Sequence, residues 1–293
     1  MIEDTSWRVL KSRAIKKKAA STPARRPRAR AVATAKSAVG NGQESGLAAL
    51  LAPKNGVMLA VEKALLRGDG INASPPIAEQ IAARMAGLIA LDILKPGQRL
   101  FENDISGILR VSRSPVRESI RILERDHLVQ LHARRGATVT APREDELQDI
   151  FEVRTALFAI LLEQVMRDRP ADLQATLEQF LPLLEQAAGG TAESYAVQSF
   201  LCNLAIADLC SNRLVVDQLK TISLRTLRYV RLGLAASENA VAGSLKGWHV
   251  FHQAVAKRDV PLVIAAATRR ISLLRDFSVA EIGKSKALAE ASA

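Results

Sequence analysis

The chain has 293 residues, which is more than one compact domain usually needs, so its length predicts two domains with additional tails. Hydrophobic residues make up 48% of the sequence and aromatic residues only 4%, which favours helical domains with their own cores over an all-β sandwich. The formal net charge of +11 indicates a polyanionic partner, and no apolar run approaches the roughly 18 residues of a membrane span, so we expect a cytoplasmic, nucleoid-associated protein with no membrane partner.

Residues 1–45 carry most of the excess positive charge. The first 40 residues hold eleven lysines and arginines against two acidic residues, and they have little periodic apolar content. Such a segment buries too little apolar surface to offset the entropy of ordering, so we predict a disordered basic arm. Two interpretations of it stay open: an arm that grips DNA without sequence preference, or a solvated tail.

The sequence of residues 46–72 predicts one helix and a linker. The stretch Val57–Arg67 is amphipathic at helical spacing, and two glycines follow closely behind it. The sequence does not indicate what this helix packs against.

Residues 73–143 have the pattern of a helix-turn-helix followed by a wing. Apolar residues at helical spacing extend over 77–90, and a second short helix is expected near Glu102–Leu109. After a third helix, short β-prone runs on both sides of Gly136 indicate a hairpin. We therefore predict a winged helix-turn-helix domain with a small β-hairpin wing.

The third helix carries the sharpest functional signal. Ser114 is its expected N-cap and Pro115 its expected first residue. Arg113, Arg117 and Arg121 recur at every fourth position and therefore share one face. Because three guanidinium groups at this spacing repel one another, the pattern argues for an anionic partner, and we expect this face to contact DNA. A solvated charged face is the alternative.

Residues 144–282 predict an all-α antiparallel bundle, so the fold class of the chain is mainly α. The helical patterns are separated by brief loops and cover residues 145–169, 173–187, 194–209, 215–234, 241–257 and 261–279. A bundle of this kind can hold a small ligand between facing helices. Residues 283–293 are expected to form a flexible tail. The sequence contains no phosphate-binding loop, nucleophile elbow or HExxH pair, so we predict no enzymatic activity.

Two stretches of the chain resemble known domains. The string PGQRLFENDISGILRVSRSPVRESIRILERDHLVQLHARRGATV, from Pro96 to Val139, closely resembles the DNA-binding domain of the GntR family. The helical part, beginning with the Glu152-Val153-Arg154 motif, resembles the FCD effector domain of the FadR-like branch, which also serves for dimerisation. The second resemblance rests on fewer positions than the first.

The first resemblance implies a set of DNA contacts. Arg113 and Arg117 should reach bases or phosphates in the major groove, and Ser112 and Ser114 should bind phosphate near the helix N-terminus. The wing should approach the minor groove. The full set of expected DNA-binding residues is Asn103, Ser112, Arg113, Ser114, Arg117, Arg121, Arg135 and Gly136. Asn103 stands where the family often has arginine, so the operator sequence cannot be transferred from relatives.

The second resemblance implies an effector cavity of altered chemistry. Many FCD domains hold a divalent metal through an aspartate and several histidines, and tracing those positions gives Ser199, Asn203, Trp248 and Arg270. Tryptophan cannot ligate a metal and the guanidinium stays protonated, so we expect no metal and no other cofactor. His249 and His252 lie close by and could supply a ligand only after a shift of register.

The residues expected around this cavity are Arg154, Ser199, Asn203, Trp248 and Arg270. An inward Arg270 could bind an effector carboxylate bidentately, with hydrogen bonds from Ser199 and Asn203 and an apolar wall from Trp248. Alternatively, Arg270 faces solvent and Trp248 only fills the core.

The function predicted from the sequence is that of a DNA-binding transcriptional regulator. We expect a dimeric repressor whose binding to a double-stranded operator is modulated by a small organic-acid effector. The alternative is an architectural protein that binds DNA of any sequence through its basic arm.

Overall fold

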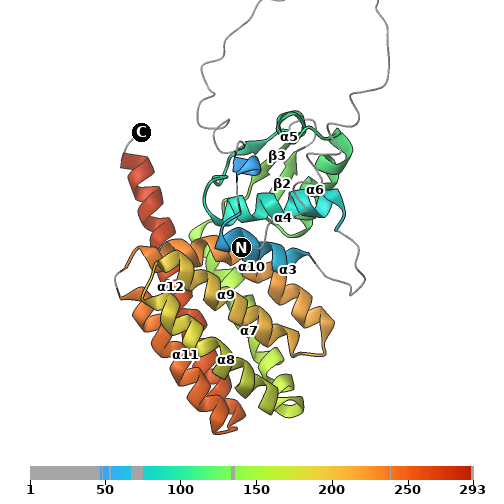
Figure 1. The fold of residues 1–293 in the computed structure, drawn as a ribbon. Helices are drawn as coiled ribbons and strands as arrows, with labels where there is room; N and C mark the ends of the chain where they lie inside the picture. Colours follow the sequence, from blue (N-terminus) through green and yellow to red (C-terminus); the bar gives the residue numbers. More distant parts are fainter. Residues whose placement is uncertain are drawn as a thin grey trace, which may run out of the picture.

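The computed structural model describes residues 47, 49–52, 54–66, 75–132, 136–237 and 239–291. The predicted basic arm, residues 1–45, lies outside this part of the chain. The described part is mainly helical with one small sheet, which confirms the predicted fold class. It forms a smaller unit that contains the sheet and a larger helical bundle, and the smaller unit lies at one end of the bundle (Figure 1). No helix among the described residues is both long and apolar enough to cross a lipid bilayer.

The smaller unit combines, within its described residues, four helices, one short 3-10 turn and three strands. These elements are η1 (Ala49–Leu51), α3 (Gly56–Leu65), α4 (Ile77–Ala90), β1 (Arg99–Leu100), α5 (Glu102–Leu109), α6 (Arg113–Arg125), β2 (Val129–His132) and β3 (Gly136–Val139). The predicted hairpin is β2–β3, with Val129 opposite Val139. The sequence did not reveal β1, which adds to the other side of β3 and completes an antiparallel sheet of order β1-β3-β2. A two-residue strand is too short to show an alternating pattern.

The predicted start of the third helix was wrong by two residues. Helix α6 begins at Arg113, and Ser112 is its N-cap residue, although the Ser112 side chain makes no capping hydrogen bond. Pro115 is therefore the third helical residue and not the first. This is permitted because the N–H groups of the first turn have no partner inside the helix, so proline loses no hydrogen bond there.

Helix α3 belongs to a hydrophobic cluster that contains residues of both units. Asn55 caps it, with its side chain accepting a hydrogen bond from the Met58 amide. The buried side of α3 packs on α4 of its own unit and on α9 of the bundle. Met58 lies so close to Gly87 of α4 that a Cβ added at Gly87 would come within 3.1 Å of the Met58 Cα. The helix whose partner the sequence did not indicate is thus a bridge between the domains.

Replacing Val61 by aspartate is expected to lower the free energy of unfolding by about 3–5 kcal/mol, because the fully buried side chain of Val61 sits in this shared core. Leu59 on the same helix is 54% exposed, so the matched Leu59→Asp change should cost no more than about 0.5 kcal/mol. Urea unfolding of both variants measures the difference. Equal losses would contradict the bridging role of α3.

The bundle, which is described without a gap except at residue 238, consists of six helices: α7 (Glu144–Asp168), α8 (Pro170–Ala188), α9 (Ala192–Asp208), α10 (Arg213–Ala235), α11 (Ala240–Ala256) and α12 (Val260–Ala291). Each predicted helix is present, with boundaries within a few residues except at the end of α12, which was predicted at residue 279 and lies at residue 291. The prediction of a flexible tail from residue 283 was wrong, because α12 continues through residue 291 and extends past the body of the bundle (Figure 1). Residues 284–291, KSKALAEA, are mostly strong helix formers with no proline, so the helix has no local reason to stop.

Candidate functional site

Helix α6 presents one apolar face to the fold and one basic face to solvent. Val116, Ile120 and Leu123 are buried, and α6 packs on α4 and β2. Arg113, Arg117 and Arg121 are exposed and share the outward face, as the sequence predicted. The burial of one face by apolar residues fixes the direction in which the arginines point. The protein therefore carries a row of exposed guanidinium groups on one fixed helix face, where a polyanion can reach them.

Arg117 is held in position by an acidic residue from the preceding helix. Its Nε and Nη2 donate to Oε1 and Oε2 of Glu102 on α5, each at 3.0 Å. The hydrogen bond from Arg117 keeps the pKa of the Glu102 carboxyl below its ordinary value, so the pair stays ionised. Two of the five N–H donors of Arg117 are engaged, and the remaining donors can face a base edge or a phosphate. Glu102 thus limits the rotamers of Arg117 before any ligand arrives.

The other arginines of this face are less restrained. Arg121 lies 3.6 Å from Glu118 on the same helix, in an exposed pair of little strength. Arg113 makes no ion pair with any residue in the described part of the chain. Ser112 and Ser114 are exposed at the N-terminal end of α6, and Asn103 is exposed on α5. All of these predicted contact residues are therefore accessible from solvent.

Of the two predicted wing residues, only Gly136 can be placed, because Arg135 lies outside the described residues. Gly136 begins β3 with φ at +78°, a conformation that side chains disfavour. A Cβ at this position would also lie 2.6 Å from the Leu100 carbonyl oxygen on β1. The absence of a side chain at Gly136 thus allows the start of β3 to pack closely against β1.

Gly136→Ala is expected to destabilise the protein by about 2 kcal/mol or more, because the methyl group meets both the left-handed backbone and the β1 carbonyl. A matched control is Gly107→Ala on α5, where nothing lies within 4 Å of the added Cβ. That change should be neutral or stabilising by up to about 1 kcal/mol. Thermal unfolding of both variants compares them, and an undiminished stability of Gly136→Ala would refute the clash.

The interior of the bundle contains a second cluster of predicted residues, centred on Arg270 of α12. Its side chain is 1% exposed, which settles that it points inward. Nη2 donates to Oδ1 of Asn203 at 2.8 Å, and Asn203 in turn donates to the Ser199 carbonyl at 2.7 Å. The guanidinium carbon lies 3.7 Å from the centre of the Trp248 ring, as in a cation–π contact. The structure thus brings together four residues from helices α9, α11 and α12.

Arg154 of α7 places a second cation in the same interior. It is 5% exposed and donates from Nη1 to the hydroxyl of Thr226 at 3.2 Å. Burial and the nearby charge of Arg270 lower the pKa of Arg154 to about 9, and burial lowers the pKa of Arg270 to about 10. Both side chains therefore remain charged at neutral pH.

Neither buried arginine has an acidic partner among the described residues. The Nε and Nη1 groups of Arg270 and the indole N–H of Trp248 also lack hydrogen-bond acceptors. An unpaired charge in a low-dielectric interior normally costs several kcal/mol. The two positive charges of this cluster therefore lack a counter-charge among the described residues, and a bound anion would supply one.

The space beside the cluster is small. A cavity of about 10 Å³ is lined by Arg154, Asn203 and Phe158 among others. This is about the room that one water molecule needs. A larger occupant requires the lining side chains to move apart.

The roles of three residues of these sites could not be predicted from the sequence. The clamping role of Glu102 depends on how α5 and α6 pack, which its position in the chain does not show. A hydroxyl and an aromatic residue on apolar helix faces usually belong to the core, so Thr226 and Phe158 gave no functional signal. The one usable sign is that Thr226 is polar at a fully buried position of α10.

The predicted metal positions do not fit a metal. Trp248 and Arg270 occupy two of them, and the guanidinium itself supplies positive charge at the centre of the cluster. Within the described ranges, no three His, Cys, Asp or Glu side chains gather at one point. His249 and His252 contact Glu185 and Gln174 of α8 instead, so a register shift would not bring them to Arg270.

Comparison with known sequences identifies both units. Residues 77–139 match the family described as bacterial regulatory proteins, gntR family, and residues 149–272 match the FCD domain. The chain is 28% identical over 124 residues to the HTH-type transcriptional regulator YdhC of Bacillus subtilis, covering 42% of this chain and 55% of that protein. It is 28% identical over 106 residues to the gluconate operon transcriptional repressor of Bacillus licheniformis, covering 36% of this chain and 43% of that protein. The chain spans about half the length of the curated relatives it matches. These families and relatives are regulators and not enzymes.

Solved structures share the fold. E. coli McbR/YncC has a TM-score of 0.58 with 20% identity, over 68% of this chain and 95% of that one. A putative GntR transcriptional regulator from Rhodococcus sp. RHA1 has a TM-score of 0.53 with 22% identity, over 70% and 96%. The helix α3 precedes both family matches, so the bridge between the domains lies outside the shared domain pattern.

Proposed function

Since the chain belongs to the GntR family and joins its DNA-binding domain to an FCD domain, we propose that it is a sequence-specific transcriptional regulator. In this proposal it binds a double-stranded DNA operator as a homodimer, and a small organic acid modulates that binding. The observation that carries the proposal is the exposed row of Arg113, Arg117 and Arg121 on a helix whose other face is buried. Repression is the favoured direction of control, because two relatives are named as gluconate operon repressors.

Footprinting of genomic fragments tests the DNA-binding part. We expect protection of one short palindromic site that persists when unrelated genomic DNA is added as competitor. Equal loss of every footprint under competition would instead support an architectural protein that binds DNA of any sequence. Genome-wide mapping of bound sites would then identify the neighbouring genes, and through them the pathway of the effector.

Homodimerisation follows from the way helix-turn-helix domains read DNA. A two-fold symmetric protein places two recognition helices in successive major grooves, about one helical turn apart. Light scattering at micromolar concentration in the presence of operator DNA should therefore give the mass of a dimer on one duplex. A monomer on the duplex would contradict the proposal.

The effector is proposed to bind at the buried arginines. Arg270 has two N–H groups without acceptors, and Arg154 adds a second charge, so a carboxylate can supply the missing negative charge and accept several hydrogen bonds. Because the cavity is nearly closed, binding should require Trp248 and its neighbours to shift. A panel of mono- and dicarboxylates should contain members that raise the melting temperature and change operator affinity. A panel that changes neither would count against an acid effector.

We further propose that this regulator works without a metal ion or other cofactor. The support is the chemistry of the cluster, in which a guanidinium occupies a position where the resemblance to metal-holding FCD domains implies an imidazole. Elemental analysis of protein purified without chelator should find no stoichiometric zinc, nickel or manganese. One full equivalent that disappears in the His249→Ala variant would show that the assignment of positions is wrong.

A further inference from the structure

The small cavity beside Arg154 lies between helices α7, α9 and α10 of the bundle. Its volume of about 10 Å³ is room for a single occupant, either a water molecule or a monoatomic ion. Its polar walls are Arg154, Asn203, Lys220 and Ser223, and its other walls are apolar. Lys220 is the only residue of the walls that is not buried, so it marks the entrance.

The buried polar groups of the wall are hydrogen-bond donors with unused N–H or O–H groups. Arg154 Nη1 donates to the Thr226 hydroxyl, whereas Nε and Nη2 keep some accessible surface and have no acceptor among the described residues. The hydroxyl of Ser223, a residue only 6% exposed, likewise has accessible surface and no hydrogen bond within the described chain. Asn203 Nδ2 uses one of its two N–H groups for the Ser199 carbonyl. These groups call for an acceptor in the cavity.

The charge balance around the cavity favours an anion over a water molecule. Arg154 has no acidic partner in the described part of the chain, and Arg270 adds a second buried positive charge through its bond to Asn203. Lys220 adds no excess charge, because it pairs with Asp208 at 2.8 Å. A water molecule could accept the hydrogen bonds but would leave Arg154 without a counter-charge in a low-dielectric interior, which is costly. A halide ion is little larger than water and supplies that charge.

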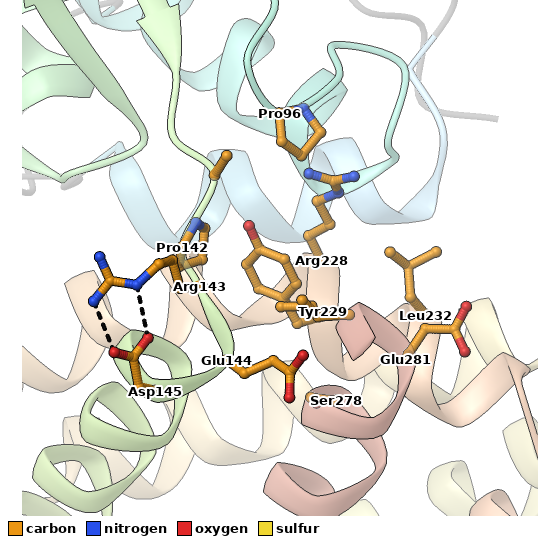
Figure 2. Close-up of a pocket in the computed structure, with 12 residues that line it drawn as sticks. Pro96, Pro142, Arg143, Glu144, Asp145, Arg228, Tyr229, Leu232, Ser278 and Glu281 are labelled. Carbon is orange, nitrogen blue, oxygen red and sulfur yellow. Dashed lines mark hydrogen bonds and ion pairs between the residues drawn. The ribbon is translucent and has the colours of Figure 1, made fainter. Parts of the chain in front are cut away.

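The wider cavity between the two units has the opposite chemistry. Its volume is about 890 Å³, and its walls include the carboxylates of Glu144, Asp145 and Glu281 (Figure 2). Arg143 on the same wall is already engaged by Asp145. Carboxylates repel an anion, so the cavity at Arg154, whose walls contain none, is the better anion site.

From this arrangement we propose that the cavity at Arg154 holds one halide ion, chloride under ordinary conditions, when no effector is bound. The ion accepts hydrogen bonds from Arg154, Ser223 and Asn203 and is the counter-ion of the buried guanidinium. The site shares Arg154 with the proposed effector site. If that proposal holds, a carboxylate must displace the ion, and the response to the acid weakens as the chloride concentration rises. Halide binding itself does not depend on the effector.

The test uses the full chain without any carboxylate. Chloride is titrated at constant ionic strength, with methanesulfonate, a polyatomic anion larger than the cavity, as the balancing anion. We expect the melting temperature to rise with chloride and then to saturate, as it does for a ligand that binds only the folded state. Crystals grown with bromide in place of chloride should show an anomalous-scattering peak between Arg154 and Ser223.

Variants separate this site from general effects of salt. Arg154→Met should abolish the saturable response to chloride, and Ser223→Ala should weaken chloride binding about tenfold because it removes one donor. The matched control is Ser278→Ala on α12. Ser278 is also buried, but its hydroxyl donates to the Leu274 carbonyl and lies outside the walls of this cavity, so the chloride response should persist.

Three results would each overturn the proposal: no bromide peak in this cavity, equal melting temperatures in chloride and methanesulfonate, or an unchanged chloride response in Arg154→Met and Ser223→Ala. Because these measurements use no carboxylate, their failure would not bear on the acid effector. A carboxylate panel without effect would in turn leave the halide site in place.

Discussion

Replacing Arg113 and Arg117 by alanine is expected to lower operator affinity by roughly 10- to 100-fold for each residue, with relaxed sequence preference. Both guanidinium groups stand on the exposed face of α6, where their forks can pair with guanine edges or phosphates. Gel-shift titration on the footprinted site at several salt concentrations measures the affinity. The slope of affinity against salt shows whether each arginine neutralises a phosphate.

The matched control is Arg125→Ala at the far end of the same helix. It removes the same charge, but Arg125 lies at the last turn of α6 and pairs with Asp126. Operator affinity should therefore change much less than in the other two variants.

Glu102→Gln tests whether the position of Arg117 matters, because it keeps Arg117 but removes the negative charge of the Glu102 carboxylate that holds it. We expect a smaller loss of affinity with weaker discrimination between operator and mutated operator. Unchanged operator affinity in Arg113→Ala and Arg117→Ala would refute their role.

Replacing Arg270 by methionine is expected to raise the stability of the free protein by about 1–3 kcal/mol and to abolish its response to the effector acid. The substitution removes a buried charge without a counter-ion and leaves an apolar side chain in contact with Trp248. Urea unfolding measures the first effect, and the shift of melting temperature with carboxylate measures the second. A gain in stability together with a loss of the ligand response would show that the charge of Arg270 serves ligand binding and not folding.

The adjacent residue provides the control. Arg269 is exposed on α12, so Arg269→Met should leave both the stability and the carboxylate response nearly unchanged. Asn203→Leu should lower stability, in contrast to Arg270→Met, because it removes the acceptor of the Arg270 Nη2 hydrogen bond while the buried charge remains. A carboxylate response that survives in Arg270→Met would place the effector elsewhere.

Much of the architecture could be predicted because it depends on local pattern. The apolar spacing along residues 144–282 indicated six helices, and all six are present in the described part of the bundle. The arginine spacing in α6 indicated a shared face, since helical geometry alone places residues i and i+4 together. The residue types at positions 248 and 270 were enough to exclude imidazole ligation there.

The remaining features depend on contacts between segments that are far apart in the sequence. Strand β1 exists only because β3 provides its hydrogen-bond partner, and α3 is a bridge only because α4 and α9 meet on either side of it. Helical spacing alone could not show whether Arg270 faces water or the interior. It does not say which face of α12 packs against α9 and α11. The sequence by itself thus determined the helices, the basic face and the chemistry available for an effector site. Only the tertiary structure decided which charges are buried together and left unpaired, because burial is a property of the packed chain and not of any one segment.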